Sequence, residues 1–421
     1  MKEIYIYKMA FRNISRNKRR TVLSAVAITL AVIFVCVMKS YIVGFNNNFR
    51  NNLFLFETGH IKILNKDFIK EEKIMPLDLS VENYTSIMTD IQKLKYIKAV
   101  LPRTKFISIL NQEGKLKTVS GLAVDIKKEC KINPLKTKIK KGRLFKEFGY
   151  KQYEIIIGEG LAESLNLKTG DKITLMAKTA EEGIGHMTFK ISGIFSYGVN
   201  EIDRNYFIIP LSTASVFLKM KNSVGELDVF LTNPDKSTIT AHKINKILKK
   251  YSGFNIYRAY DWKEQKNGQY YKIVTITDKS YNIIYVVLLI LASLVIINTT
   301  MMVIYERIKE IGTLASLGMR PFAIVKLFFY EALIISIIGS LAGTIFGGIL
   351  SYGISKYGID LAKLGGKGIG FQISNIIYPY FGFDILLFSF LFGVVVSAVC
   401  VFIPSLKAAR IKPITALRNE L

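Results

Sequence analysis

The sequence predicts a polytopic α-helical membrane protein with four transmembrane helices and a large α+β extracytoplasmic domain between helices one and two. Its mean hydropathy is +0.29 although only 50% of the residues are hydrophobic, so the apolar residues must be gathered in blocks. Four such blocks are long enough to cross a bilayer. The long segment 44–279 between the first two blocks instead alternates strand and helix patterns.

The first predicted span is 21–43, built around the uncharged run Val22–Met38. As a helix it would extend about 34 Å, enough for a hydrocarbon core of about 30 Å. A cleaved signal peptide is the alternative, but no small-residue cleavage pattern follows Met38. We therefore predict an uncleaved signal anchor, with Lys39 near its outer end, where a long side chain can snorkel.

The remaining predicted spans are 280–305, 322–355 and 382–405. In the third, Gly339, Gly343 and Gly347 recur every four residues and give the helix one small face that another backbone can approach. That approach could lie within this subunit or between two subunits. Glu331 would be costly facing lipid, so we expect it to meet a partner such as Lys326 or a donor on another helix.

Basic residues set the predicted orientation. The N-terminal segment 1–20 has seven Lys or Arg against one acid, and the tail 406–421 is also basic. Both termini and the loop 306–321 are therefore predicted to be cytoplasmic. The domain 44–279 and the loop 356–381 are then periplasmic, which makes the chain a multi-pass protein of the cell (inner) membrane.

The domain 44–279 contains seven short β-rich runs and four helical patterns. The strand predictions are His60–Leu64, Phe106–Leu110, Glu154–Ile157, Lys172–Leu175, Thr188–Phe195, Tyr206–Ile209 and Leu227–Leu231. The helix predictions are Val81–Lys98, Glu159–Leu167, Leu211–Met220 and Thr238–Tyr251, the last ending at Gly253.

Catalytic motifs are missing from the sequence. It has no phosphate-binding loop, no H-E-x-x-H and no G-x-S-x-G, and Leu364–Gly370 is best interpreted as a turn. Its three histidines are scattered, so we expect no metal site, no other cofactor and no enzymatic activity.

A net charge of +26 without an aromatic-interleaved basic stripe argues against nucleic acid as a partner. Cys130 is the only cysteine outside the apolar blocks, which excludes a disulfide within the domain.

A short amphipathic helix is predicted directly after the second span, within 306–319. Apolar residues recur there every three positions, and Gly318 and Pro321 end the pattern. It could lie in the lipid head groups or dock a cytoplasmic partner. The residues that carry this prediction are Glu306, Arg307, Glu310, Ile311, Leu314, Leu317 and Gly318.

The order E-R-x-x-E-I-G-x-L-x-x-L-G in this segment resembles the coupling helix of the FtsX/MacB-type (type VII) ABC transporter permeases. The basic segment Ala10–Thr21, Glu331 with the glycines after it, and the ending Pro404–Arg418 are similar to other parts of the same family. Within the outer domain, Thr58–Ile63, Ile156–Ala162 and Phe189–Asp203 resemble the lipoprotein-releasing permeases LolC and LolE.

The resemblance implies a permease subunit that works with a dimer of a separate cytoplasmic ABC ATPase, which binds the ATP. It implies lipoprotein cargo drawn from membrane lipid, a second permease subunit, identical or paralogous, and a periplasmic lipoprotein carrier. The residues of 306–319 would couple to the ATPase, and Glu331 with Gly339, Gly343 and Gly347 would pack helices. A MacB-like exporter of peptides or amphiphiles and an FtsX-like signalling scaffold for cell-wall hydrolases remain alternatives.

Overall fold

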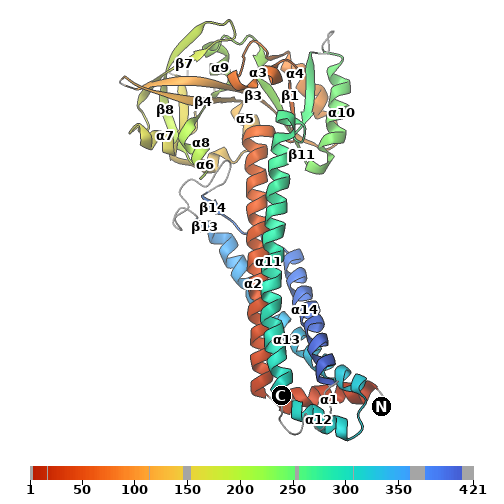
Figure 1. The fold of residues 1–421 in the computed structure, drawn as a ribbon. Helices are drawn as coiled ribbons and strands as arrows, with labels where there is room; N and C mark the ends of the chain where they lie inside the picture. The colour runs from red at the N-terminus through yellow and green to blue at the C-terminus, as the bar shows by residue number, and fades with distance from the viewer. Residues whose placement is uncertain are drawn as a thin grey trace. The chain divides into compact units, whose positions relative to one another are not determined.

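The structure, a computed structural model, describes residues 3–16, 18–112, 114–145, 153–251, 256–306, 308–360 and 375–409 (Figure 1). It divides into two compact units. The helical unit comprises Met1–Asn46, Thr277–Ile359 and Ile377–Leu421, and the α/β unit comprises Asn47–Ile276 and Asp360–Ile376.

Among the residues that the structure describes, four helices are long and apolar enough to span a membrane, which confirms the predicted number. Each is longer than its predicted span. The helices of this part of the chain are α1 (Glu3–Arg16), α2 (Lys18–Leu53), α11 (Gln269–Glu306), α12 (Ile308–Ser316), α13 (Pro321–Tyr357) and α14 (Phe383–Ala409).

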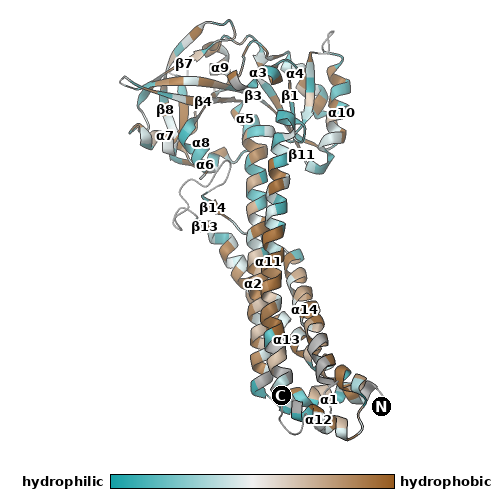
Figure 2. Ribbon diagram, viewed as in Figure 1, coloured by the Kyte–Doolittle hydropathy of each residue, from teal (hydrophilic) through white to brown (hydrophobic). Residues whose placement is uncertain are grey.

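A core forms where the four long helices meet, around Val32 and Val35 of α2, Ile296 of α11 and Ile335 of α13. Hydrophobic residues cover much of α2, α11 and α14 (Figure 2), and the α13 span is also strongly apolar. Many large apolar side chains on these helices are exposed, among them Ile349 at 63%. This is the pattern of a lipid-facing surface rather than of a water-soluble bundle.

The α/β unit contains a closed ring of paired strands. β3 pairs with β4, β4 with β9, β9 with β6, β6 with β8, β8 with β7, and β7 again with β3. Alternate residues of these strands point inward and form one core, which includes Phe106, Phe189 and Phe207. The strands are β3 (Ile97–Gln112), β4 (Lys115–Val124), β6 (Glu154–Gly158), β7 (Lys172–Lys178), β8 (Ile184–Phe195) and β9 (Tyr206–Pro210).

The first half of β3 extends beyond this barrel and continues the sheet in the order β3, β11, β1, β12. Helices α4 and α10 contribute Ile87, Ile91 and Ile244 to a second core on these strands. The ten-stranded sheet of this unit therefore has two lobes, and β3 belongs to both. The elements of this lobe are β1 (Ile61–Asn65), α4 (Tyr84–Gln92), β11 (Glu226–Leu231), α10 (Ser237–Leu248) and β12 (Tyr257–Asp261).

Shorter elements connect these parts. They are η1 (Phe54–Thr58), α3 (Phe68–Glu71), η2 (Glu72–Ile74), β2 (Val81–Glu82), α5 (Ile126–Glu129), α6 (Leu135–Lys138), β5 (Ile139–Gly142), α7 (Glu159–Ser164), α8 (Asn200–Asn205), α9 (Leu211–Phe217), β10 (Ser223–Val224), η3 (Pro234–Lys236), η4 (Gln265–Gly268), β13 (Ile359–Asp360) and β14 (Ile376–Ile377).

All seven predicted strands exist, but the helix prediction Val81–Lys98 is wrong at both ends. Val81 begins strand β2, and Ile97 already pairs with Leu231 of β11. Tyr96 has a φ of 76°, which reverses the chain between helix and strand. The pairing of residues distant in sequence overrides the local helical pattern. Three other predicted helices exist but end three residues before their predicted ends; these are the helices predicted at 159–167, 211–220 and 238–251. Two predicted turns lie outside the described residues, namely Gly253 and Leu364–Gly370.

The pattern did not predict strands β4 and β12. β4 is built from Lys115–Val124, where Lys, Thr and Ser alternate only loosely with apolar residues. It is nevertheless central, since it pairs with β3 along its whole length and with β9 on its other side.

Candidate functional site

The segment after α11 forms a short helix closed by a glycine turn. α12 spans Ile308–Ser316, and Gly318 follows with a φ of 84°. The N–H of Met319 donates to the carbonyl of Leu314 (3.1 Å), and that of Gly318 donates to the carbonyl of Ala315 (3.0 Å). This pair of bonds is the Schellman ending, which favours glycine at the left-handed position. Pro321 then begins α13.

The apolar face of α12 packs on the first turns of α13. Ile311 is 1% exposed and lies in a cluster with Ile324 and Phe328. Leu314 joins both this cluster and a second one that contains Ile6 of α1. α12 is thus held by α13 and α1, and a force on it would pass to both.

The other predicted coupling residues have different surroundings. Leu317 is 78% exposed, because the helix has already ended and the residue lies in the turn. Glu310 is also exposed. Glu306 is the last residue of α11, and Arg307 lies outside the described residues.

The glycines of α13 lie against α2 of the same chain. A Cβ at Gly339 would be 2.9 Å from the carbonyl oxygen of Ala25, and one at Gly343 would be 2.7 Å from the Cβ of Val32. A Cβ at Gly347 would be 2.9 Å from that of Cys36. Only glycine leaves room for this contact along three turns.

Polar groups accompany this close contact. Thr29 of α2 donates its hydroxyl to the carbonyl of Gly339 across the helix pair (3.1 Å). Glu331, about two turns before the first of these glycines, is only 5% exposed. It is therefore buried among the helices and does not face lipid.

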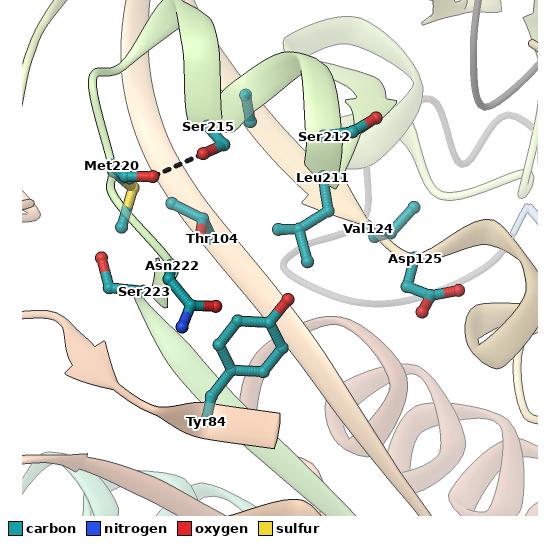
Figure 3. A pocket seen from close by; sticks show the side chains of 11 residues that line it. Tyr84, Thr104, Val124, Asp125, Leu211, Ser212, Ser215, Met220, Asn222 and Ser223 are labelled. Atoms are coloured by element: carbon teal, nitrogen blue, oxygen red, sulfur yellow. Dashed lines mark hydrogen bonds between the residues drawn. The ribbon is translucent and has the colours of Figure 1, made fainter. Parts of the chain in front are cut away.

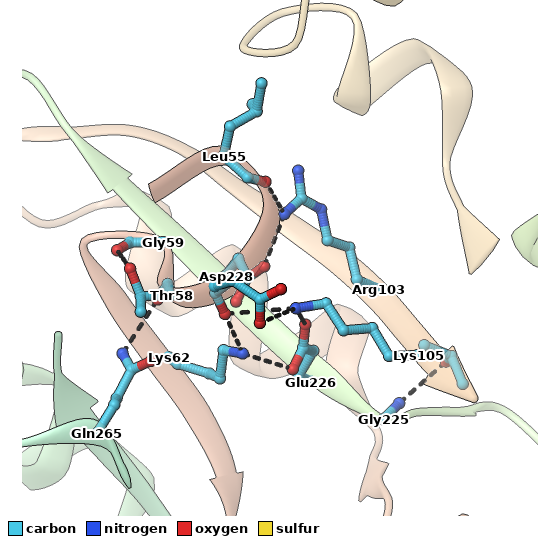
Figure 4. A network of polar contacts seen from close by, with 12 residues as sticks. Leu55, Thr58, Gly59, Lys62, Arg103, Lys105, Gly225, Glu226, Asp228 and Gln265 are labelled. Carbon is cyan, nitrogen blue, oxygen red and sulfur yellow. Dashed lines mark hydrogen bonds and ion pairs between the residues drawn. The ribbon is translucent and has the colours of Figure 1, made fainter. Parts of the chain in front are cut away.

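A network of buried charges occupies the α/β unit beside the end of α2 (Figure 4). Arg103 of β3 is completely buried and holds Glu129 with two nitrogens, Nε to Oε2 (3.0 Å) and Nη2 to Oε1 (2.6 Å). Its Nη1 donates to Asp228 Oδ2 (2.8 Å) and to the carbonyl of Leu55 (2.7 Å). Leu55 belongs to the π-helical turn η1 that follows α2. One guanidinium thus connects two strands, α5 and this turn.

A second half of the network surrounds Glu226. Lys62 of β1 pairs with it at 2.9 Å and Lys105 of β3 at 3.4 Å. Burial would raise the pKa of Glu226, but the two ammonium groups outweigh burial and lower it to about 2. Lys62 also donates to the carbonyl of Glu57, and the Tyr270 hydroxyl donates to the carboxylate of Glu57 (3.2 Å). Glu57 lies in η1 and Tyr270 at the start of α11, so the ends of both helices are bound into one polar cluster.

The sequence analysis assigned no role to this network. A signal was present, since Arg103 and Lys105 alternate on one strand and Glu226 and Asp228 alternate on another. Residues two positions apart on a strand point to the same face, so two basic residues on one strand can lie opposite two acidic residues on its neighbour. The register pairs Arg103 directly with Glu226.

The sequence pattern of Phe189–Asp203 reflects a turn at the end of β8. Asp203 accepts hydrogen bonds from the backbone N–H groups of Tyr197 (2.8 Å) and Gly198 (2.9 Å) and from the hydroxyl of Ser196 (2.8 Å). A Cβ at Gly193 would clash with the carbonyl oxygen of Arg143. The glycine and the aspartate are therefore needed to fold this corner.

The α/β unit also has a pocket of about 470 Å³ between its two lobes (Figure 3). Its polar lining consists of hydroxyl and amide groups, including those of Tyr84 and Asn222, and of the Asp125 carboxylate. That carboxylate already accepts from two backbone N–H groups as the cap of α5. No histidine, cysteine or lysine is among the described residues that line it. Across the described residues, no cluster of three or more His, Cys, Asp or Glu side chains could hold a metal ion.

Two family models match the sequence. The MacB-like periplasmic core domain matches residues 21–247, more than half of the chain, and the FtsX-like permease C-terminal domain matches residues 282–413. The chain belongs to the FtsX/MacB-type permease family. It is thus a permease of an ABC transporter, and this class of subunit works with an ATPase partner.

Relatives of this permease include lipoprotein-releasing and export proteins. It is 23% identical over 411 residues to the lipoprotein-releasing system transmembrane protein LolC of Neisseria meningitidis, covering 95% of this chain and 94% of that one. It is 23% identical to LolE of Haemophilus influenzae, covering 79% and 78%. It is 26% identical to the macrolide export ATP-binding/permease protein MacB of Nitrobacter winogradskyi, covering 56% of this chain and 34% of that one.

Proposed function

We propose that this permease is a subunit of an ABC complex that releases lipoproteins from the plasma membrane toward a periplasmic carrier. The observation that carries the proposal is the end-to-end similarity to LolC, which spans 95% of this chain and 94% of the relative. The similarity to MacB covers only 34% of that protein. A separate ATPase subunit would supply the nucleotide site, and the permease would bind no cofactor itself.

In this proposal both termini, with segments 1–20 and 406–421, and the loop 306–321 face the cytoplasm. The domain 44–279 and the loop 356–381 face the periplasm, and the spans are 21–43, 280–305, 322–355 and 382–405. The excess of Lys and Arg before the first span supports this direction.

The ATPase would act on α12. Exposed Glu310 and Leu317, together with Glu306 and Arg307, would meet the ATPase surface. Buried Ile311 would transmit the force from the ATPase to α13, and Leu314 would transmit it to both α13 and α1. Gly318 would keep the turn between α12 and α13 rigid.

The motion would then reach the periplasmic domain through helix contacts. α13 lies on α2 through its three glycines, and α2 leads into the turn that Arg103 and Lys62 hold. A shift of α2 would therefore pull on the sheet directly. Closing of a cavity between two permease subunits would at the same time expel the acyl chains of the cargo.

Reconstitution tests this function. The chain would be purified with its bound partners, which mass spectrometry identifies, and assayed in proteoliposomes for ATP-dependent lipoprotein release. Depletion in cells should leave lipoproteins in the plasma membrane, whereas unaltered lipoprotein sorting would contradict the proposal.

The coupling role has its own test. Glu310→Lys combined with Leu314→Asp should abolish ATP-driven release and weaken ATPase binding. Intact complex formation and release in this double variant would show that α12 does not couple to the ATPase.

The MacB-like alternative differs only in cargo, so the same proteoliposomes loaded with peptides or small amphiphiles would detect it. An FtsX-like scaffold would instead move no cargo. The large α/β unit, which matches the MacB-like core, favours a transporter over that scaffold.

A further inference from the structure

Lys39 of α2 is a charged side chain among the membrane-spanning helices, and aromatic rings of two others, α11 and α14, lie against it. Its ammonium nitrogen lies 3.5 Å from the ring centroid of Phe388 on α14 and 5.0 Å from that of Tyr285 on α11. The two rings are 5.8 Å apart. The side chain is thus turned toward aromatic faces inside the helical unit and does not simply extend along the lipid, as the sequence suggested.

The aromatic rings stabilise the charge but leave its hydrogen-bonding capacity unused. An ammonium has three N–H donors, and a ring face is not a conventional acceptor. In the described part of the chain, no carboxylate lies within ion-pair distance of Lys39; Asp384, one turn before Phe388, attracts it only from further away. The hydroxyl of Tyr285 is also buried and has no hydrogen-bond partner among the described residues. Two donor groups therefore share one aromatic cluster without an acceptor.

The depth of this cluster matches the lipid head groups. Lys39 lies 18 residues after Thr21, so the helical rise places it about 27 Å along α2, near the far side of a hydrocarbon core of about 30 Å. Tyr41 and Phe45 of α2 and Tyr281 of α11 lie at the same end, with ring centroids 6.4 Å and 4.8 Å apart. Such aromatic residues mark the membrane–water interface.

We propose that Lys39 and Tyr285 bind the phosphate group of an anionic phospholipid in the leaflet at the Tyr41 end of α2. A phosphate oxygen offers the negative charge that the ammonium lacks and the acceptor that both donors lack. The bound lipid would connect α2, α11 and α14 at one level of the membrane. This site is separate from cargo release and does not depend on which cargo the permease carries.

Lipid binding can be measured on the purified full-length chain by native mass spectrometry with phosphatidylglycerol as the probe. Lys39→Gln should weaken phosphatidylglycerol binding about tenfold or more, because a hydrogen bond to a charged group is lost together with the charge. Lys39→Arg should retain the lipid. Tyr285→Phe keeps the ring, so it should weaken binding by a smaller factor.

The matched control is Lys356→Gln. Lys356 also lies over an aromatic ring at this end of a span, 4.6 Å from the centroid of Tyr352, but it is exposed. This variant should bind phosphatidylglycerol as the unaltered chain does. Since Tyr285→Phe and Lys39→Arg both preserve packing, the test holds even if Lys39→Gln folds poorly.

Two results would overturn the proposal. One is equal phosphatidylglycerol binding by the unaltered chain, Lys39→Gln and Tyr285→Phe, which would make Lys39 only a packing residue. The other is equal thermal stabilisation of the detergent-purified chain by inorganic phosphate and by phosphatidylglycerol, which would indicate a free-phosphate site. Stabilisation by phosphatidylglycerol but not by phosphatidylcholine or inorganic phosphate would support the lipid site.

Discussion

Replacing Arg103 by methionine should destabilise the α/β unit strongly. The guanidinium is completely buried and compensates two carboxylates, those of Glu129 and Asp228, at 2.6 Å and 2.8 Å. Removing one partner of a buried ion pair costs about 3–5 kcal/mol, because the remaining charge stays desolvated. With a urea m-value near 3 kcal/mol/M for a unit of this size, the midpoint should fall by about 1–2 M.

The chain provides a local probe for this measurement. Trp262 is its only tryptophan and lies buried in the α/β unit, with its ring 5.3 Å from that of Phe54. Its fluorescence in the full-length chain should therefore follow unfolding of this unit and not of the membrane helices. Urea titration of each variant gives the midpoint directly.

The matched control is Arg143→Met. Arg143 also binds a glutamate, Glu154, through two nitrogens, but its side chain is 53% exposed. An exposed pair contributes about 1 kcal/mol or less, so its midpoint should change little. Adding Glu129→Gln and Asp228→Asn to Arg103→Met should recover part of the loss. A midpoint for Arg103→Met no lower than that for Arg143→Met would refute the argument.

Three other perturbations have defined outcomes. Gly343→Leu should disrupt the α2–α13 contact and lower the thermal stability of the helical unit. Gly353→Leu on the same helix should leave the thermal stability unchanged, because the space around its Cβ is open. Equal losses of thermal stability in the two variants would contradict the close contact. Gly318→Val should reduce ATPase binding in a pull-down, because φ of 84° strains a β-branched residue, while Gly318→Asn should be tolerated. Burial lowers the pKa of His60 to about 4, so the folded protein keeps this side chain neutral while the unfolded chain binds a proton below pH 6.5. The free energy of unfolding, measured by Trp262 fluorescence, should therefore fall by about 3 kcal/mol as the pH falls from 6.5 to 4. In His60→Gln this free energy should change little over the same pH range, and a pH dependence equal to that of the unaltered chain would contradict the prediction.

The low pKa of Glu226 predicts a second acid step at still lower pH. A carboxylate whose folded pKa is about 2 stabilises the protein above its unfolded pKa of 4.5. This stability is lost as pH falls from 4.5 toward 2, a window that begins where the His60 window ends. The two groups therefore act in sequence in the same unit.

The sequence by itself determined the elements whose signal is local. A membrane span needs only a run of apolar residues, and the end of α12 needs only a glycine able to adopt positive φ, so the four spans and the turn at Gly318 could be predicted. Strand alternation located β7 and β9 for the same reason. Where the local pattern was weak, as in β4, or misleading, as after Gln92, the prediction failed.

Only the tertiary structure decided which elements meet. Arg103 contacts Glu129, 26 residues away, and Asp228, 125 residues away. The alternating charges of β3 and β11 permit a contact between the strands, but they do not specify which residues meet. Likewise, the spacing of the glycines predicted that one face of α13 carries only small residues, but it did not predict that α2 packs on that face. The sequence indicated that Lys39 had to avoid the lipid core, yet its aromatic partners come from helices about 250 and 350 positions later. Hydrophobic patterning reports how deeply a residue is buried, whereas its partner is set by packing of distant segments.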